Sequence, residues 1–271
     1  MRFRLATWNI NSVRLRLDLV RRFVRAHRPD FLCLQEIKCI EGHFPARELR
    51  ALGFPHIAVA GQKGYHGVAT LSRIPFTLKE RRDICGRGHA RHLSIAIDGA
   101  GAQPILLHNV YVPAGGDIPD PALNDRFRHK LEFLEALACW FEGMRGKRQS
   151  RMIMVGDLNV APLPTDVWSH RQLLKVVSHT PAEVECLERV QASQGWVDVM
   201  RRHVPAEEKL FTWWSYRNRD WRASNRGRRL DHVWTTPSLD GTARSMTVLD
   251  ATRDWPRTSD HVPVLADFVI E

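Results

Sequence analysis

Two short segments of this chain carry carboxylate, amide and imidazole side chains at close spacing. They are Val155-Gly156-Asp157-Leu158-Asn159 and Ser259-Asp260-His261-Val262-Pro263, about a hundred residues apart. A phosphodiester is anionic and repels hydroxide, so its hydrolysis requires charge neutralisation, a water held in line and an acceptor for the proton of that water. If the two segments meet in space, they predict a centre that hydrolyses phosphate esters with a divalent metal.

The first segment follows an apolar run that has the length of a buried strand. That run is Met152-Ile153-Met154-Val155, and Gly156 marks the point where the chain emerges. Asp157 and Asn159 are two residues apart at the end of the strand, so their side chains point to the same face and can hold one water together. An isolated Asp-x-Asn more often caps a turn, so the interpretation depends on its neighbours.

Other polar residues occupy equivalent positions. Asn9 and Glu36 follow two further apolar runs, Tyr111 ends a third and Asp231 opens a fourth. With Asp157 and Asn159 they make six polar groups at the ends of apolar runs. Packing alone is a poor explanation for that number, so the pattern indicates a functional site.

The order of the motifs resembles the exonuclease III branch of the endonuclease/exonuclease/phosphatase superfamily, the class II apurinic/apyrimidinic endonucleases. Each motif alone is weak, but their order is specific and covers nearly the whole chain. The motifs are Thr7-Trp8-Asn9-Ile10-Asn11, Leu34-Gln35-Glu36-Ile37-Lys38, Gly61 to Ala69, Tyr111-Val112-Pro113, Gly156 to Pro162, Thr212 to Arg217, Arg229-Leu230-Asp231 and Ser259-Asp260-His261.

This resemblance implies a magnesium centre, with Mn²⁺ as a substitute. Glu36 would bind the metal, while Asn9 and Asp260 would support the metal and its waters. Oxygen ligands suit Mg²⁺, which accepts one or two carboxylates and keeps several waters. The number of metals stays open.

The resemblance also implies the catalytic roles. Asp157 would orient or deprotonate the attacking water, and Asn159 would fix its position. His261, kept cationic by Asp231, would donate to a non-bridging phosphate oxygen, and Tyr111 would stabilise the charged phosphate or the leaving group. These five residues are the expected catalytic set.

Basic and aromatic residues in loops are the candidates for DNA contact. Lys63, Gly64 and Tyr65 combine a cation, a flexible glycine and a ring, and Arg91 belongs to a second basic segment. Such groups give salt-dependent, sequence-neutral affinity for a phosphate backbone. The alternative for each loop is an ordinary solvated surface.

The expected pocket for an abasic nucleotide departs from the family pattern. Trp213 and Leu230 match its apolar wall, but Arg228 stands where relatives carry an aromatic or aliphatic side chain. Ala114 replaces the Asn or Gln that usually follows Tyr-Val-Pro and contacts the cleaved strand. These differences affect the choice of substrate and leave the hydrolytic centre intact.

The segment 163–179 also departs from the pattern, and Trp168 or His170 within it could occlude the pocket. Narrowing of the pocket would favour 3′-phosphatase or 3′–5′ exonuclease activity over abasic incision.

Composition agrees with a polyanionic partner. The 271 residues carry a formal net charge of +10 and a sequence pI near 9.9, although a basic surface can also serve solubility alone. No Pro-, Gly- or Ser-rich linker divides the chain, so we expect one domain over 1–271.

The cysteines and the hydropathy of the sequence indicate the cellular compartment in which the protein works. The five cysteines form no C-x-x-C pair, which argues against a disulfide framework or a zinc site and for a reducing cytosol. The sequence has no apolar run of about 18 residues and no secretion signal. We therefore expect a cytoplasmic protein, associated with the nucleoid through DNA and not with membranes; a monomer is usual in the family it resembles.

The alternation of apolar runs predicts an α/β fold. Strands are expected near 2–9, 31–35, 55–60, 67–72, 92–97, 104–111, 151–157, 231–236 and 262–269, and helices near 12–27, 44–52, 121–143 and 181–194. The pattern suggests two packed mixed sheets flanked by helices, which resembles the four-layer α/β sandwich of the family.

We therefore expect a Mg²⁺-dependent DNA repair nuclease acting on double-stranded DNA that is damaged or has 3′ ends. Abasic-site incision, 3′–5′ exonuclease and 3′-phosphatase or phosphodiesterase activity all stay open. One alternative is a catalytically weak nucleic-acid-binding regulator resembling the catabolite repression control proteins, which lack catalytic residues that this sequence retains. Another is a phosphoinositide or sphingomyelin hydrolase, which the basic, Trp-rich segment 213–229 disfavours.

Overall fold

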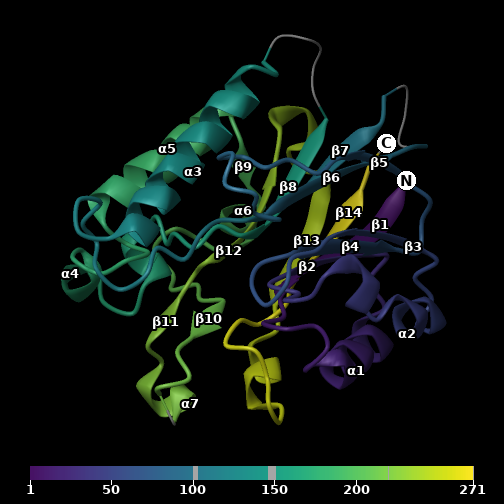
Figure 1. The fold of residues 1–271 in the computed structure, drawn as a ribbon, viewed down its shortest axis with the longest axis horizontal. Coiled ribbons are helices and arrows are strands. Elements are labelled where there is room, and N and C mark those ends of the chain that lie inside the picture. Colours follow the sequence, from purple (N-terminus) through teal and green to yellow (C-terminus); the bar gives the residue numbers. More distant parts are fainter. Residues whose placement is uncertain (100–102, 146–150, 219, 271) are drawn as a thin grey trace.

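Two six-stranded mixed β-sheets pack face to face, with helices on their outer faces (Figure 1). The structure, a computed structural model, describes residues 1–99, 103–145, 151–218 and 220–270. The expected α/β sandwich of two packed sheets flanked by helices is confirmed.

The first sheet has β1 and β2 at its centre, paired in parallel, and all its other pairs are antiparallel. Its strands in spatial order are β13 (Ala243–Val248), β14 (Val264–Val269), β1 (Arg2–Asn9), β2 (Phe31–Gln35), β4 (Val68–Ser72) and β3 (His56–Ala60).

The second sheet also has one parallel pair, β7 with β8. Its strands in spatial order are β5 (Thr77–Glu80), β6 (His92–Ile97), β7 (Ile105–Tyr111), β8 (Met152–Asp157), β12 (Asp231–Thr235) and β9 (Val197–Asp198). A separate two-stranded ribbon, β10 (Trp213–Trp214) and β11 (Gly227–Arg228), extends from the sandwich with α7 (Trp221–Ser224) at its tip (Figure 1).

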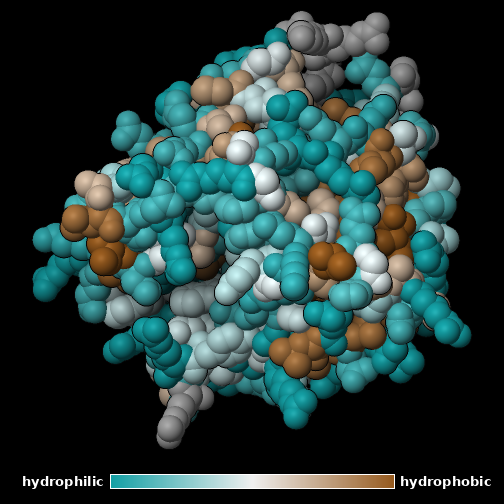
Figure 2. All heavy atoms as spheres, viewed as in Figure 1, coloured by the Kyte–Doolittle hydropathy of each residue, from teal (hydrophilic) through white to brown (hydrophobic). Residues whose placement is uncertain are grey.

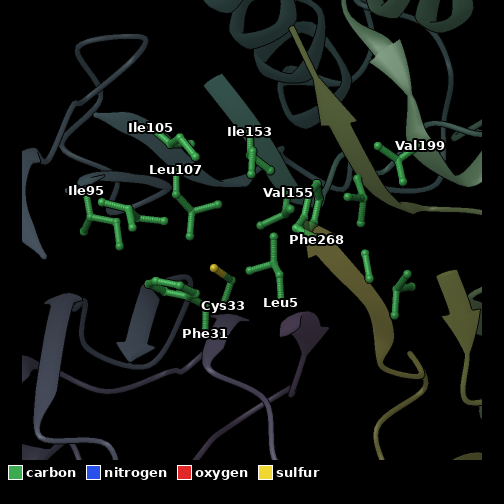
Figure 3. Close-up of a cluster of buried hydrophobic side chains, with 14 of the residues drawn as sticks. Leu5, Phe31, Cys33, Ile95, Ile105, Leu107, Ile153, Val155, Val199 and Phe268 are labelled. Atoms are coloured by element: carbon green, nitrogen blue, oxygen red, sulfur yellow. The ribbon is translucent and has the colours of Figure 1, made fainter. Parts of the chain in front are cut away.

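The central strands are apolar on both faces because each face meets a different layer. In β1, Leu5 points into the core between the sheets, whereas Trp8 points toward the helices on the outer face. In β8, Val155 points inward and Met154 outward in the same way. Side chains from both sheets interdigitate between the layers (Figure 3). Burial on both faces therefore holds the ends of β1, β2, β7 and β8 in fixed positions.

Two helices cover each outer face (Figure 1). On the first sheet these are α1 (Leu17–His27) and α2 (Ala46–Ala51), and on the second α3 (Asp125–Glu142) and α5 (Pro181–Gln194). Shorter helices are α4 (His170–Leu173) and α6 (Val199–His203). Among the described residues, no helix is both long and apolar enough to cross a membrane. On the face shown in Figure 2, hydrophilic residues cover most of the surface and hydrophobic residues form small separate groups.

Several boundaries differ from those expected. The helix expected from residue 12 begins at Leu17, because Asn11 and Ser12 have positive φ angles of 47° and 83° that a right-handed helix excludes. The helix expected from residue 121 begins at Asp125, after Asn124, whose side chain accepts a hydrogen bond from the backbone of Arg126.

Strands β5 and β13 were not expected. They are edge strands of the two sheets and carry mostly exposed or half-buried residues, so their sequences lack an apolar run.

Candidate active site

The strand register brings three of the predicted residues side by side. On the second sheet, Tyr111 at the end of β7 pairs with Asp157 at the end of β8, and Asp157 pairs with Asp231 at the start of β12. Asp157 and Asp231 are fully buried. Their alignment requires close strand packing at Gly156, because a Cβ there would lie 1.9 Å from the Val110 carbonyl oxygen and its φ is 141°.

The first sheet supplies the facing residues. Asn9 ends β1, and its amide nitrogen donates to Glu36 Oε1 at 2.9 Å and to Asp157 Oδ2 at 2.8 Å. Asn9 therefore joins the two sheets at the site. The Tyr111 hydroxyl donates to the same Glu36 oxygen at 2.8 Å. The Glu36 carboxylate is thus oriented by Asn9 from the first sheet and by Tyr111 from the second.

Asp157 and Asn159 form the pair expected from their spacing. The Asn159 side-chain amide donates to Asp157 Oδ2 at 3.0 Å, and its backbone N–H donates to Oδ1 at 3.0 Å. Asn159 has a φ of 54° and Glu36 a φ of 50°, a left-handed conformation that is uncommon for these residues. Strain of this kind clusters at functional sites, where surrounding contacts enforce it.

His261 lies between the two buried aspartates. Its Nδ1 is 2.8 Å from Asp231 Oδ2, and its Nε2 is 3.7 Å from Asp157 Oδ2. The bridge between Trp213 and His261 and a hydrogen bond from the His261 N–H to Ser259 Oγ hold this segment in place. The two halves recognised in the sequence therefore do meet.

The charges of these groups follow from their environment. Burial raises the pKa of Asp157 to about 7, opposed by the charge of His261 and reinforced by Asp231. Burial alone would lower the pKa of His261, but Asp231 and Asp157 outweigh it and raise the pKa to about 10. At neutral pH the imidazole is therefore cationic and Asp157 is poised to gain or lose a proton.

Glu36 and Tyr111 are held in opposite protonation states, the first ionised and the second protonated. Burial would raise the pKa of Glu36, but the charge of Lys38 and the hydrogen bond from Asn9 hold it below the ordinary value. Burial, with Glu36 beside it, raises the pKa of Tyr111 well above its usual range. The glutamate is ionised and the phenol stays a hydrogen-bond donor.

Asp260 lies at the edge of the cluster. Its Oδ1 accepts from the side chain of Asn11 at 3.1 Å, and its Oδ2 accepts from the indole of Trp213 at 3.0 Å. Asn11 in turn accepts from Lys38 Nζ at 2.6 Å. Since Lys38 Nζ is also 2.8 Å from Glu36 Oε2, carboxylate and amide oxygens already surround a cationic group here.

This donor set fits a hard cation such as Mg²⁺. A second group, formed by Asp157, Asp231 and His261, has ligand atoms within 4.8 Å of one another and could also hold a metal. At neutral pH the His261 ring is cationic, so this second group takes a metal only if the ring loses its proton.

The predicted DNA-contacting residues fall into two places. Lys63, Gly64 and Tyr65 lie on an exposed loop, and the side chain of Tyr65 is 72% exposed. Arg91 is buried instead, with its guanidinium 4.7 Å from the centre of the Tyr111 ring. The Arg91 guanidinium also donates to the Tyr111 carbonyl oxygen at 3.3 Å, so it helps to hold Tyr111 in place.

Trp213, Leu230 and Arg228 lie together near the Asp260 side. Trp213 and Leu230 pack in one small apolar cluster, which Trp168 also contacts. The Arg228 guanidinium lies 5.2 Å from the Trp213 ring centre and donates to the Val177 carbonyl oxygen at 2.8 Å.

His170 and Ala114 lie outside the apolar cluster formed by Trp213 and Leu230. His170 is 2.8 Å from a ring nitrogen of His179, so it is tied to its own loop. Ala114 is exposed beside a cavity described below.

Sequence reasoning missed a buried ion pair beneath Asn159. Lys130 Nζ donates to the Asn159 carbonyl oxygen at 2.7 Å and to Glu183, and both charged side chains are fully buried. Glu183 also accepts from the backbone N–H groups of Ser178 and Thr180. Charged residues on amphipathic helices usually face solvent, so only the structure reveals this pair. Lys38 and Asn11 belong to motifs quoted from the sequence, but no role was assigned to them there.

The family model described as the Endonuclease/Exonuclease/phosphatase family matches residues 6–261. The chain belongs to this family. Its motifs, its two-sheet fold and the convergence of its buried polar groups agree with that membership.

Individual relatives narrow the branch. The chain is 28% identical over 269 residues to exodeoxyribonuclease III of Haemophilus influenzae, covering 97% of this chain and 98% of that protein. An AP endonuclease from Archaeoglobus fulgidus superposes with a TM-score of 0.88 at 29% identity, covering 98% and 99% of the two chains. A Neisseria 3′ phosphatase bound to a product DNA hairpin superposes with a TM-score of 0.87 at 26% identity, with the same coverage. The expected exonuclease III and AP endonuclease branch, and with it a nuclease-type phosphodiesterase, is confirmed.

Proposed function

We propose that this chain is a Mg²⁺-dependent DNA repair nuclease in which Asp157 activates the attacking water. The observation that carries the proposal is the convergence of Asn9, Glu36, Asp157 and His261 at the facing ends of both sheets. Bound Mg²⁺, held by Glu36 with support from Asp260 and Asn9, would neutralise phosphate oxygens.

The chain's own residues would prepare the reaction. Asp157, with its pKa raised by burial to about 7, is suited to take a proton from water near neutral pH. Asn159 and Asn9 fix the orientation of that carboxylate. The His261 imidazolium and the Tyr111 hydroxyl would donate to phosphate oxygens as negative charge develops.

We further propose that 3′-end processing predominates over abasic incision. Arg228 bridges β11 to the loop at Val177 and Ser178 and stacks on Trp213, so a cation with little freedom occupies one wall of the expected lesion pocket. A baseless sugar is uncharged and would gain nothing from this rigid charged wall. A terminal 3′-phosphate is anionic and would be attracted to the Arg228 cation.

The test uses two labelled duplexes, one with an internal abasic analogue and one intact with a recessed 3′ end, with Mg²⁺ and then with chelator. We expect Mg²⁺-dependent shortening of the recessed strand, with slower incision at the abasic site. Arg228→Leu should raise the ratio of incision to trimming, and an exposed change on α2, Arg47→Leu, should not. An unchanged ratio in Arg228→Leu contradicts the role given to that residue, and no cleavage of either duplex contradicts the nuclease itself.

We also propose that the chain acts as one domain and as a monomer. All residues of the proposed site come from one chain, so no partner copy is needed to complete it. Light scattering of the eluted protein should give the mass of a single chain, 31.2 kDa.

A further inference from the structure

A cavity of about 450 Å³ opens beside Tyr111. The loop that carries Tyr65 and His66 forms one side, the loop 113–116 another, and the start of α3 a third. Tyr111 lines it, but Asp157, Asp231, His261 and the Trp213 cluster do not. The cavity therefore adjoins the hydrolytic centre at Tyr111 but lies outside the expected lesion pocket.

Three histidine rings form a continuous wall of this cavity. The ring centres of His66 and His89 are 4.6 Å apart, and those of His89 and His129 are 5.1 Å apart. Arg91 donates to a ring nitrogen of His66 at 2.9 Å, so that nitrogen carries no proton. Burial, with neighbouring arginines, lowers the pKa of His66 to about 3 and of His129 to about 4. Burial and the charge of Arg91 lower the pKa of His89 as well, so all three rings are uncharged at neutral pH.

Two ring nitrogens in this wall have no partner. Within the described part of the chain, His89 Nδ1 and His129 Nε2 are buried without a hydrogen bond. His129 as a whole is only 6% exposed. Buried polar atoms normally have partners, so these two mark hydrogen-bonding capacity that a ligand can use after a small ring rotation.

Cations and small residues surround the opening. Arg126 is exposed and has no ion pair among the residues that the structure describes. Ala114 and Gly116 leave the opposite side free of long side chains. The cavity thus combines one flat wall of uncharged rings with two cations, Arg91 inside and Arg126 at the rim. The remaining rim charges, Arg87 and Asp125, pair with each other.

We propose that this cavity is a subsite for one unpaired nucleotide of the DNA strand, next to the phosphate that is cleaved. The proposal rests on the nuclease function proposed above. Uncharged aromatic walls suit the faces of a base, and a free arginine suits its phosphate. The volume lies within the range of about 300 to 1,000 Å³ that is usual for small-molecule sites. A base within the stack cannot reach a cavity, so the occupant must be frayed or flipped out.

The first test compares two duplexes that end in an unpaired 3′ residue. One ends in deoxyadenosine and the other in a tetrahydrofuran residue that lacks the base. We expect wild-type protein to remove the nucleotide about tenfold faster than the baseless residue, since stacking of one base is worth about that factor. Equal rates would overturn the proposal.

Ala114→Phe fills the cavity from an exposed position, so it should fold normally and lose most of the preference. Leu123→Phe adds the same ring to the same loop outside the lining, at a residue that is 75% exposed, and should keep it. His89→Ala removes part of the aromatic wall and should reduce the preference, whereas His203→Ala, an exposed histidine, should not. Unaltered preference in both cavity variants would overturn the proposal.

The second test does not depend on cleavage. A duplex with a 3′-terminal unpaired 2-aminopurine is titrated with protein in chelator, and its fluorescence reports stacking of that base. We expect quenching with wild-type protein and little with Ala114→Phe. Quenching without any cleavage in Mg²⁺ would refute the proposed nuclease and keep the subsite; cleavage without quenching would refute the subsite alone.

Discussion

Asp157 and Asp231 lie directly opposite each other on the antiparallel strands β8 and β12, and both are fully buried. Two adjacent carboxylates repel each other, and burial adds to the cost of ionising both. The imidazole of His261 bonds to one and faces the other, which divides their roles. Asp231 fixes the cationic ring, and Asp157 stays available to exchange a proton.

The first prediction concerns pH. Cleavage needs Asp157 ionised and His261 protonated, so the rate should rise as pH passes about 7 and fall as pH passes about 10. Single-turnover rates on a recessed duplex, measured across this range with circular dichroism to verify folding, give the profile. A flat profile from pH 6 to 11 would contradict these assignments.

A variant separates the two limbs of that profile. Asp231→Asn removes the charge that raises the pKa of His261, so the alkaline limb should move to lower pH. Asp240→Asn changes an exposed carboxylate and should leave the limb in place.

The second prediction concerns the metal. Glu36→Gln removes the charge of the proposed ligand, so the Mg²⁺ concentration for half-maximal rate should rise at least tenfold, a loss of roughly the size seen even for indirect metal contacts. Titration of Mg²⁺ into chelator-treated protein measures it, with the exposed Glu142→Gln as the matched control. An unchanged midpoint in Glu36→Gln would place the metal elsewhere, with the group at Asp231 and His261 as the next candidate.

The third prediction concerns the buried ion pair of Lys130 and Glu183. Lys130→Met leaves Glu183 buried without its partner and should cost about 3 to 5 kcal/mol in the free energy of unfolding. Adding Glu183→Gln removes the unpaired charge and should recover much of that loss, as urea denaturation would show.

Activity should not recover in parallel. The double variant still lacks the hydrogen bond from Lys130 to the Asn159 carbonyl oxygen, which helps to hold Asn159 in its left-handed conformation. If stability and kcat are restored together, Lys130 has only a structural role.

Local sequence predicts the elements whose residues are buried on both faces. The runs that became β2 and β8 are mostly apolar without interruption, and β6 alternates His92 and Ser94 with apolar residues. The expected bounds of all three agree with the structure to within a residue. Asn9, Glu36, Tyr111, Asp157, Asn159 and Asp231 were found because they lie at the ends of such runs, whereas Asp260 and His261 were found through their motif.

What could not be predicted depends on contacts between distant segments. The strand β13 is recognisable only through its pairing with β14, because its own residues are mostly half-buried. The environment of Arg91 is likewise set by Tyr111 on another strand, so a residue expected at the DNA surface is buried. Spacing along the chain carries no signal for such contacts.

The most direct test of the central claim compares DNA binding and cleavage in Asp157→Asn. The amide keeps the size of the carboxylate but cannot take a proton from water. We predict that the variant binds a recessed duplex about as tightly as wild type, while its single-turnover rate in Mg²⁺ falls by about 100-fold or more, the range that general base catalysis contributes. Cleavage by the variant at the wild-type rate would contradict the account.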